Sequence, residues 1–241
     1  MRFGKRGLCG DWFPNTQGGH SALNIIYTPG LASVRNGEKS RGFRDLAQRI
    51  GASYLRYDLF GHGDSPGTRR DLTVMDAVED LKQIVDFTTK ETKKGREKTV
   101  LVGASLGGYI SLISAMNTPF HSIVVIGGAF DFAKRINLNP TNENGDIILD
   151  SVYSGRLVLG RDIGKGVPSD EYLSDALKQQ CVLSVHGQMD EVVPIQLARN
   201  FFAINRNPDS WFWEVDRQQG GDHRLNKPLD KILEKVTHTI T

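Results

Sequence analysis

The chain has 241 residues and a formal charge of +2, from 30 Lys and Arg against 28 Asp and Glu. This near balance gives no support to a nucleic-acid or anionic-membrane partner. Hydrophobic residues make up 39% and charged residues 24%, as in ordinary globular proteins, so we expect a single domain over 1–241. No stretch approaches the ~20 apolar residues of a membrane span, and we expect no stable membrane insertion.

The cysteines, Cys9 and Cys181, show neither a disulfide framework nor metal-ligand spacing. We expect free thiols in a reducing compartment. The first residues carry basic side chains without a following apolar run, which argues against a secretory signal peptide. The cytoplasm is the expected location, and an organelle matrix after removal of a transit peptide is the alternative.

From Leu23 onward, short apolar runs alternate with helical patterns, which is typical of βα units on a mostly parallel sheet. In chain order we expect a strand over 23–28, a helix over 42–50, a strand over 53–60, a helix over 73–88 capped by Thr73, and a strand over 99–104. There follow a helix after Ser105, strands over 122–128 and 181–187, a helix over 195–204, a strand over 210–215 and a helix over 229–236. The charged stretch 90–98 reads as a solvated loop, and 131–178 is irregular.

Residues 103–107 read GASLG and fit the pattern Gly-x-Ser-x-Gly. The pattern alone is weak evidence, because a chain with 26 glycines can match it by chance. Its position is more informative, since it lies where an apolar strand gives way to a helix and would place Ser105 in the tight turn between them. The unpaired amides at the start of that helix favour an oxyanion. Ser105 is therefore the candidate nucleophile.

A serine hydroxyl needs a neighbouring base, so this hypothesis requires a histidine. His223, in GGDHRL, follows the last predicted strand at the sheet edge where open α/β sheets bind ligands. His62 lies in a turn after an early strand and His186 ends a strand. The remaining histidines have no catalytic setting: His20, His121 and His238. His223 is the candidate base, with a surface or structural role as the alternative.

The segment HGQMDEVVP places Asp190 after a buried strand and before a helix. The order Ser105, Asp190, His223 is the one that this strand-turn-helix architecture requires. Asp190 is thus the candidate orienting acid. Asp131, after the preceding strand, and Glu191 remain competitors, and a helix-capping aspartate is the alternative to a catalytic role.

An oxyanion hole needs backbone N–H groups that converge on the substrate oxygen. The candidates are Leu106, directly after the nucleophile, and Leu31, after Pro29 and Gly30 at the end of the first predicted strand. An ordinary strand-ending turn is the alternative interpretation of the Pro-Gly pair.

In order along the chain, TPGL, DLFGHGDS, GASLGG, HGQMDEVVP and GDHRL resemble the motifs of α/β hydrolases and together cover nearly the whole chain. The PGL turn, the Asn36-Gly37 pair, RYDLFGHGDS and the DHR ending look most like small mitochondrial acyl-protein thioesterases and acyl-glucuronide esterases, and bacterial cinnamoyl and feruloyl esterases. The resemblance implies the α/β-hydrolase fold, with a mostly parallel central sheet flanked by helices. It also implies a Ser105–His223–Asp190 triad, an oxyanion hole at Leu31 and Leu106, a small acyl ester or thioester as substrate, and no cofactor or metal.

The chain departs from the family pattern in its first strand loop and at its start. Pro29-Gly30 stands where the family usually has His-Gly, which removes a side chain that often buttresses the loop. Residues 1–22 fit poorly with the antiparallel hairpin that leads the fold, so we expect this edge to be short or missing.

Family members carry a substrate-covering lid in the interval between the strands expected at 122–128 and 181–187. Here the interval of about 131–178 has room for two or three short helices. Its apolar residues either line an acyl pocket or pack the lid onto the core: Ile147, Ile148, Leu149, Val152, Tyr153, Leu157, Val158 and Leu159. No Lys or Arg of this interval is assignable to a substrate carboxylate, and the substrate-binding residues are left open.

Two other functions stay open. A serine aminopeptidase would share the triad, but it needs an acidic site for the substrate amine, which the sequence does not identify. A non-catalytic binding protein on the same fold is the other alternative. The sequence does not indicate an oligomeric state.

Overall fold

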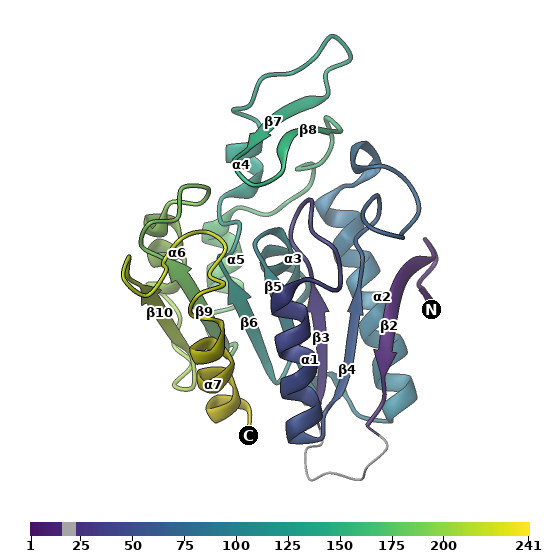
Figure 1. The fold of residues 1–241 in the computed structure, drawn as a ribbon, viewed down its shortest axis with the longest axis vertical. Helices are drawn as coiled ribbons and strands as arrows, with labels where there is room; N and C mark the ends of the chain where they lie inside the picture. Colours follow the sequence, from purple (N-terminus) through teal and green to yellow (C-terminus); the bar gives the residue numbers. More distant parts are fainter. Residues whose placement is uncertain (16–22) are drawn as a thin grey trace.

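The computed structural model describes residues 1–15 and 23–241. Within these residues, strands form an eight-stranded sheet in the order β1-β2-β4-β3-β5-β6-β9-β10. The central strands β3, β4, β5, β6, β9 and β10 run parallel to their neighbours, and β2 pairs antiparallel with β4. The strands span Arg2–Phe3, Leu8–Phe13, Ser53–Tyr57, Asn24–Thr28, Thr99–Ala104, Ser122–Ile126, Val182–Gly187 and Trp211–Val215, in sheet order. This is the expected mostly parallel sheet (Figure 1).

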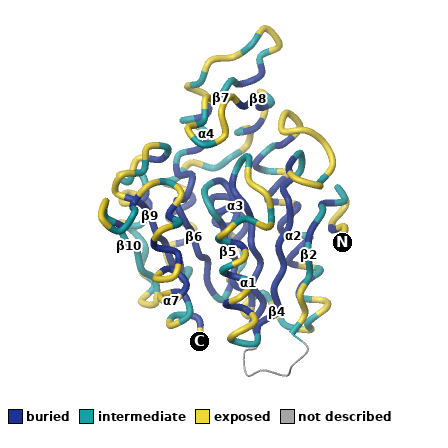
Figure 2. The backbone as a smooth tube through the Cα atoms, in the orientation of Figure 1, coloured by how far each residue is buried: buried dark blue, intermediate teal, exposed yellow. Residues whose placement is uncertain are grey.

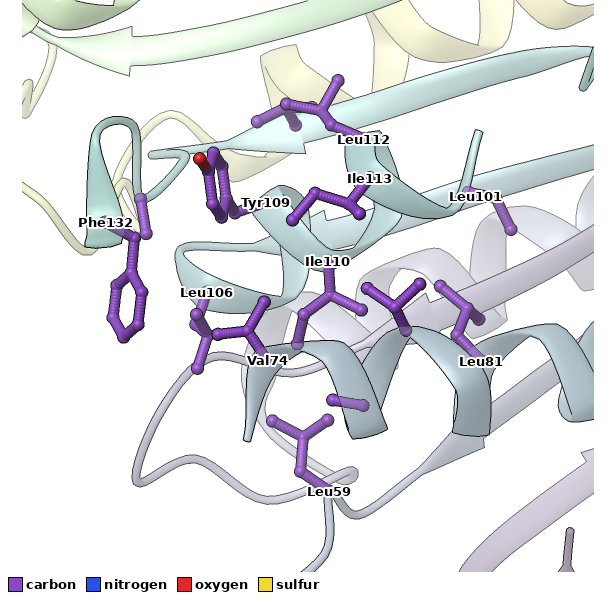
Figure 3. Packing of buried hydrophobic residues seen from close by; sticks show 14 of the residues in the cluster. Leu59, Val74, Leu81, Leu101, Leu106, Tyr109, Ile110, Leu112, Ile113 and Phe132 are labelled. Atoms are coloured by element: carbon purple, nitrogen blue, oxygen red, sulfur yellow. The ribbon is translucent and has the colours of Figure 1, made fainter. Parts of the chain in front are cut away.

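Helices cover both faces of the sheet (Figure 1). Helices α1 (Glu38–Ile50) and α7 (Leu229–Ile240) pack together on one face, and α2 (Val74–Thr92) and α3 (Leu106–Ser114) pack together on the other. Figure 3 shows Ile110 of α3 near Val74 of α2, with Leu81 farther along α2. Helix α6 (Ile195–Phe202) follows β9.

The core is divided by the sheet because successive strand residues point to opposite faces. In β3, Ile26 packs with α2 and α3, whereas Ile25 packs with α1 and α7. In β5, Leu101 belongs to the first cluster, and Val100 belongs to the second. Strands that are buried on both faces are expected for a parallel sheet covered by helices.

Several predicted element boundaries are wrong. Helix α1 begins at Glu38 rather than 42, and α2 continues to Thr92, into the stretch expected to be a solvated loop. That helix ends where Lys93 adopts a left-handed conformation, and Arg96–Lys98 form the short 3-10 helix η2. The predicted cap of α2 is confirmed, since the Thr73 hydroxyl accepts the Asp76 N–H at 3.1 Å.

The N-terminal edge is short but present. Strands β1 and β2 pair antiparallel, with Phe3 opposite Leu8, and both of these side chains are buried. Burial of these apolar residues against α2 explains why the hairpin forms although its sequence gave a weak signal.

An insertion separates β6 from β9. It contains α4 (Phe132–Ile136), a hairpin of β7 (Ile147–Ser151) and β8 (Gly155–Leu159), and α5 (Asp170–Ala176). The short helices α4 and α5 agree with the room expected for two or three such helices, whereas the sequence did not indicate the hairpin between them. In the hairpin, Gly155, with a φ of 67°, follows the turn between the two paired strands. Figure 2 shows much of this insertion exposed beyond the end of the buried sheet.

Of the helices in residues 1–15 and 23–241, none combines the length and the apolar character that crossing a bilayer requires.

Candidate active site

Ser105 lies between β5 and α3 in a strained backbone conformation. Its φ of 50° and ψ of −117° fall outside the regions that residues with side chains favour. The Ser105 N–H donates to the Ile126 carbonyl at 2.9 Å, and its own carbonyl accepts the N–H of Gly108 at 3.0 Å. These bonds hold the strand-to-helix turn that the motif predicted.

The flanking glycines are required by close approach of the backbone. A Cβ on Gly103 would lie 2.3 Å from the Gly107 backbone, and a Cβ on Gly107 would lie 2.1 Å from the Thr28 carbonyl oxygen. Both separations are shorter than atoms tolerate. The spacing of the motif therefore has a steric cause, because α3 must pass close to β3 and β5 for the serine to stand at the sheet edge.

The side chains of Ser105, His223 and Asp190 form one hydrogen-bonded chain. His223 Nε2 lies 3.1 Å from Ser105 Oγ, and His223 Nδ1 lies 2.8 Å from Asp190 Oδ2. An ionised carboxylate can only accept hydrogen bonds, so Nδ1 carries the proton and Nε2 is free to accept the serine proton. The structure thus brings together the side chains that the sequence placed at separate strand ends.

Every oxygen of Asp190 has partners. Oδ1 accepts the N–H groups of Val192 at 2.9 Å and Val193 at 2.7 Å, and Oδ2 also lies 3.2 Å from His186 Nε2. Burial disfavours the charged form, but the hydrogen bonds from His186 and His223 outweigh it and hold the pKa of Asp190 well below its ordinary value. The carboxylate is therefore ionised at neutral pH.

The competing residues lie elsewhere. The Asp131 carboxylate pairs with Lys134 at 3.5 Å beside α4, and the Glu191 carboxylate accepts the Tyr153 hydroxyl. His238 bonds a carbonyl of its own helix, and His121 lies beside the N-terminus of β6. His20 lies outside the described residues.

The loop after β3 borders Ser105. A Cβ on Gly30 would lie 3.1 Å from the Ala104 carbonyl oxygen and 3.2 Å from Ser105 Cβ. Leu31 and Leu106 both line the same cavity as Ser105. Leu106 opens α3, so its N–H has no acceptor one turn earlier in the helix. The role of these amides as oxyanion donors stays a prediction.

A cavity of about 510 Å³ opens over Ser105 and His223, beneath the insertion. Its apolar side includes Phe132, Ile136, Leu149 and Leu157. The apolar residues of the hairpin therefore divide between the two expected roles. Leu149, Tyr153 and Leu157 line the cavity, Ile147 and Leu159 are buried in the core, and Val152 and Val158 are exposed.

The cavity lining also includes polar and cationic side chains. Lys39 donates to the Asn226 side chain at 2.8 Å, and burial lowers the pKa of Lys39 to about 8. Arg224 lies beside it on the His223 loop. From the insertion, the Arg135 guanidinium reaches the Val192 carbonyl, and burial lowers its pKa. Arg135 lies in the interval 131–178, where the sequence did not identify a Lys or Arg that could bind a substrate carboxylate, and the structure places it in the cavity lining.

Within 1–15 and 23–241, no group of three or more His, Cys, Asp or Glu side chains is arranged to hold a metal ion.

The model of one protein family, serine aminopeptidase S33, matches residues 35–180. The chain belongs to this family. Among curated proteins, the S33-family chain is similar to the palmitoyl-protein thioesterase ABHD10, mitochondrial, of Mus musculus, with 28% identity over 218 residues that cover 86% of this chain and 70% of the relative.

Solved structures share the fold of this S33-family chain. The ferulic acid complex of Est1E from Butyrivibrio proteoclasticus has a TM-score of 0.79 at 19% identity, with 100% of this chain and 99% of that one covered. The α/β hydrolase domain-containing protein 10 from mouse has a TM-score of 0.68 at 23% identity, with 97% and 92% covered. The chain is thus an α/β hydrolase of the serine hydrolase class, similar to esterases and thioesterases.

Sequence reasoning missed residues that touch this site. His186 supports Asp190, and the Tyr153 ring stacks on His223 with centroids 6.2 Å apart and an interplanar angle of 20°. Arg224 lies over the same tyrosine ring at 4.3 Å. The glycine after His186 indicates that a strand ends there, but it does not indicate that His186 contacts Asp190. Nothing in the sequence signals the tyrosine contact, which joins residues of separate elements.

Proposed function

We propose that this serine hydrolase cleaves a carboxylic ester or thioester of a small to medium acyl group by way of an acyl-enzyme on Ser105. The observation that carries the proposal is the hydrogen-bonded chain Ser105–His223–Asp190 at the floor of a cavity with an apolar side. A serine held in this way beside a neutral imidazole is suited to nucleophilic catalysis.

In the first half-reaction, Ser105 Oγ attacks the carbonyl carbon while His223 Nε2 takes the hydroxyl proton. The Leu31 and Leu106 amides stabilise the oxyanion, and the ionised Asp190 stabilises the imidazolium. His223 then returns the proton to the leaving oxygen or sulfur, which departs as an alcohol or thiol. Water repeats the sequence on the acyl-enzyme, gives its proton to His223, and releases the acid with the serine restored.

The insertion acts as the lid in this proposal, and its apolar residues receive the acyl chain. The thioesterase name of the mouse relative supports a thioester as one substrate, and the ferulic acid complex supports an aromatic acyl group as another. The mitochondrial name of the relative favours the organelle matrix over the cytoplasm.

The family description raises aminopeptidase activity as a second candidate. A substrate amine would be an ammonium group and would need a carboxylate in the cavity. Among the described lining residues, Glu38 is the acidic side chain, whereas Lys39, Arg135 and Arg224 are basic. This charge balance opposes an ammonium group and favours the esterase or thioesterase reaction. A non-catalytic binding protein would have no need of a nucleophile–base pair.

The test is covalent labelling by a fluorophosphonate together with hydrolysis of p-nitrophenyl esters from acetyl to palmitoyl, acyl-CoA thioesters and aminoacyl anilides. We expect Ser105→Ala to lose labelling and ester hydrolysis while circular dichroism is unchanged. Ser33→Ala is the matched control, because Ser33 also lines the cavity but is not part of the hydrogen-bonded chain. Continued labelling of Ser105→Ala would refute the proposed nucleophile, and faster cleavage of anilides than of esters would favour the aminopeptidase.

A further inference from the structure

Hydrogen bonds join the loop after β3 to the glycine-rich turn after β4. The Ala32 N–H donates to His62 Nε2 at 3.0 Å, and the Arg35 N–H donates to Asp58 Oδ1 at 2.6 Å. The Arg35 guanidinium also pairs with Asp58 and Asp64. The loop that carries Leu31 is therefore held by side chains of the segment DLFGHGD, residues 58–64, which follows β4.

The contacts of His62 define its protonation. A backbone N–H can only donate and a backbone carbonyl can only accept. Because Ala32 donates to Nε2 and the Phe60 carbonyl lies 3.0 Å from Nδ1, the proton must be on Nδ1 and the lone pair on Nε2. The side chain is 3% exposed, so water cannot readily replace either partner.

The Ala32 conformation needs such a partner. The Ser33 N–H bonds the Gly30 carbonyl at 3.1 Å and closes a turn in which Ala32 has a φ of 57°. A positive φ at the third residue of a turn normally requires glycine. Whether φ is positive or negative there depends on how the peptide before that residue is oriented. His62 bonds the N–H of that peptide, which joins Leu31 to Ala32.

We propose that His62 is a positioning residue for the oxyanion site: its Nε2 lone pair fixes the Leu31–Ala32 peptide and, through the Gly30–Ser33 turn that contains it, the preceding Gly30–Leu31 peptide, whose N–H faces the carbonyl oxygen of a substrate at Ser105. The inference rests on the proposed function. The Ala32 N–H is committed to His62, so Leu31 is the loop residue that supplies the oxyanion donor.

Protonation of the ring would invert this arrangement, because both nitrogens of an imidazolium are donors. Nε2–H would then face the Ala32 N–H, and the peptide would have to turn. Burial, aided by Arg69, lowers the pKa of His62, while the bond to the Phe60 carbonyl and the charge of Asp58 oppose the shift. Arg35, from the loop, is already paired with Asp58 and Asp64. The ring is therefore neutral near pH 7 and loses its lone pair only in acid.

The first experiment compares His62→Phe, which removes the acceptor, with His62→Gln, whose amide oxygen can replace it. With p-nitrophenyl butyrate, we expect kcat of His62→Phe to fall at least about tenfold with KM within about twofold, since loss of a whole oxyanion donor costs roughly a hundred- to a thousandfold. Binding of a trifluoromethyl ketone, which forms an oxyanion on Ser105, should weaken by the same factor. His62→Gln should keep kcat within about threefold, because an amide oxygen is an acceptor of similar reach.

His121→Phe is the matched control, because burial also lowers the pKa of this histidine, which lies beside the N-terminus of β6. We expect its kcat to stay at the wild-type value. Equal losses in the Phe and Gln variants of His62, an unchanged kcat in both, or a change in KM alone would overturn the inference. If the wild-type protein hydrolyses no ester or thioester, the proposed function fails instead.

A second pair of measurements does not depend on folding of the Phe variant. In wild-type protein, log(kcat/KM) should fall more steeply in acid than in His62→Gln, because protonation of His62 removes the acceptor of the Ala32 N–H and the Gln variant has no such proton to bind. Nitrogen-15 NMR of the unmodified protein should show His62 with a bare Nε2. A protonated Nε2 at neutral pH, or a slope that the Gln variant leaves unchanged, would contradict the proposal.

Discussion

The strand-end site and the insertion above it are built in different ways. At the strand ends, Ser105, His223 and Asp190 are satisfied by one another and by backbone groups, and the turn of the serine leaves no room even for a methyl group at Gly103. In the insertion, Leu138 is 85% exposed and Val152 is 71% exposed. Figure 2 shows this contrast as a buried sheet below and an exposed projection above.

The contrast indicates a division of labour. Groups that must hold sub-ångström geometry come from the rigid ends of buried strands, where a displaced atom would break several contacts at once. We propose that the groups that select the substrate come from the insertion, where substitution of its exposed residues costs little stability. Changes at the strand ends should therefore abolish reactivity toward all substrates, and changes in the insertion should alter the choice among them.

The largest expected effect is at Asp190. Asp190→Asn keeps the size of the side chain but replaces an acceptor of the His223 Nδ1–H by an amide that can impose the wrong tautomer. We expect kcat to fall by roughly 10³- to 10⁴-fold, with little change in KM, as for orienting acids of serine triads. The assay is hydrolysis of p-nitrophenyl butyrate. The control is Asp131→Asn, the competing carboxylate after β6, which should leave kcat within about twofold.

A large loss in Asp131→Asn, with Asp190→Asn nearly intact, would show that the ground-state geometry misleads about the acid. It would also contradict the proposal that reactivity depends on the strand ends alone, because Asp131 lies in the insertion, at the start of α4.

The strand-end site was predictable because each of its residues follows a local signal. An apolar run that ends in GASLG specifies a strand, a tight turn and a helix, and parallel strands bring all their carboxyl ends to one edge. Asp190 and His223 each follow such a strand. The sequence therefore determined which side chains meet, without any information about distances.

The supporting contacts were not predictable in this way. His62 bonds Ala32, and Tyr153 stacks on His223, through pairings between elements that no local pattern encodes. The hairpin was missed because its strands are short and half-exposed, so their alternation is weak. The edge strands β1 and β2 gave a weak signal for the same reason: the core that buries Phe3 and Leu8 comes from distant parts of the chain.

A smaller effect is expected in the insertion, at Tyr153. Tyr153→Ala removes the ring that covers His223 and lines the cavity, and an aromatic contact of this kind is worth about 0.5–1.5 kcal/mol beyond its buried area. We expect kcat/KM for long-chain esters to fall about two- to tenfold, and for acetate esters to change less. Tyr153→Phe keeps the ring and loses the hydrogen bond to Glu191, so it should behave like the wild type.

A Tyr153→Ala loss as large as that of Asp190→Asn, and independent of acyl length, would make the hairpin part of the reactive machinery. The proposed separation of reactivity and selectivity would then not apply to this molecule.

The smallest expected effect is on stability, at Lys39 in the cavity lining. Lys39 is partly buried, with its pKa lowered from 10.5 to about 8, so below pH 8 the folded state holds a charge that burial penalises. The unfolded chain binds this proton more tightly, and wild-type stability should rise as the pH increases from about 8 to 10.5. We expect Lys39→Met to have a Tm about 2–4 °C above the wild type at pH 7, as for a gain near 1 kcal/mol in a chain of this size, and to lose that advantage toward pH 10.5.

Lys82→Met is the control, because Lys82 is exposed on α2 and its removal should change Tm by the same small amount at every pH. The pH dependence separates two views of the cavity wall beside α1. If the higher Tm of Lys39→Met disappears at alkaline pH, the cavity lining around Lys39 is closely packed, like the strand ends. The charge of Lys39 then lowers the stability of the folded protein at neutral pH. If the advantage is absent or does not depend on pH, water reaches Lys39 freely, and this wall is more like the exposed insertion than like the site that it borders.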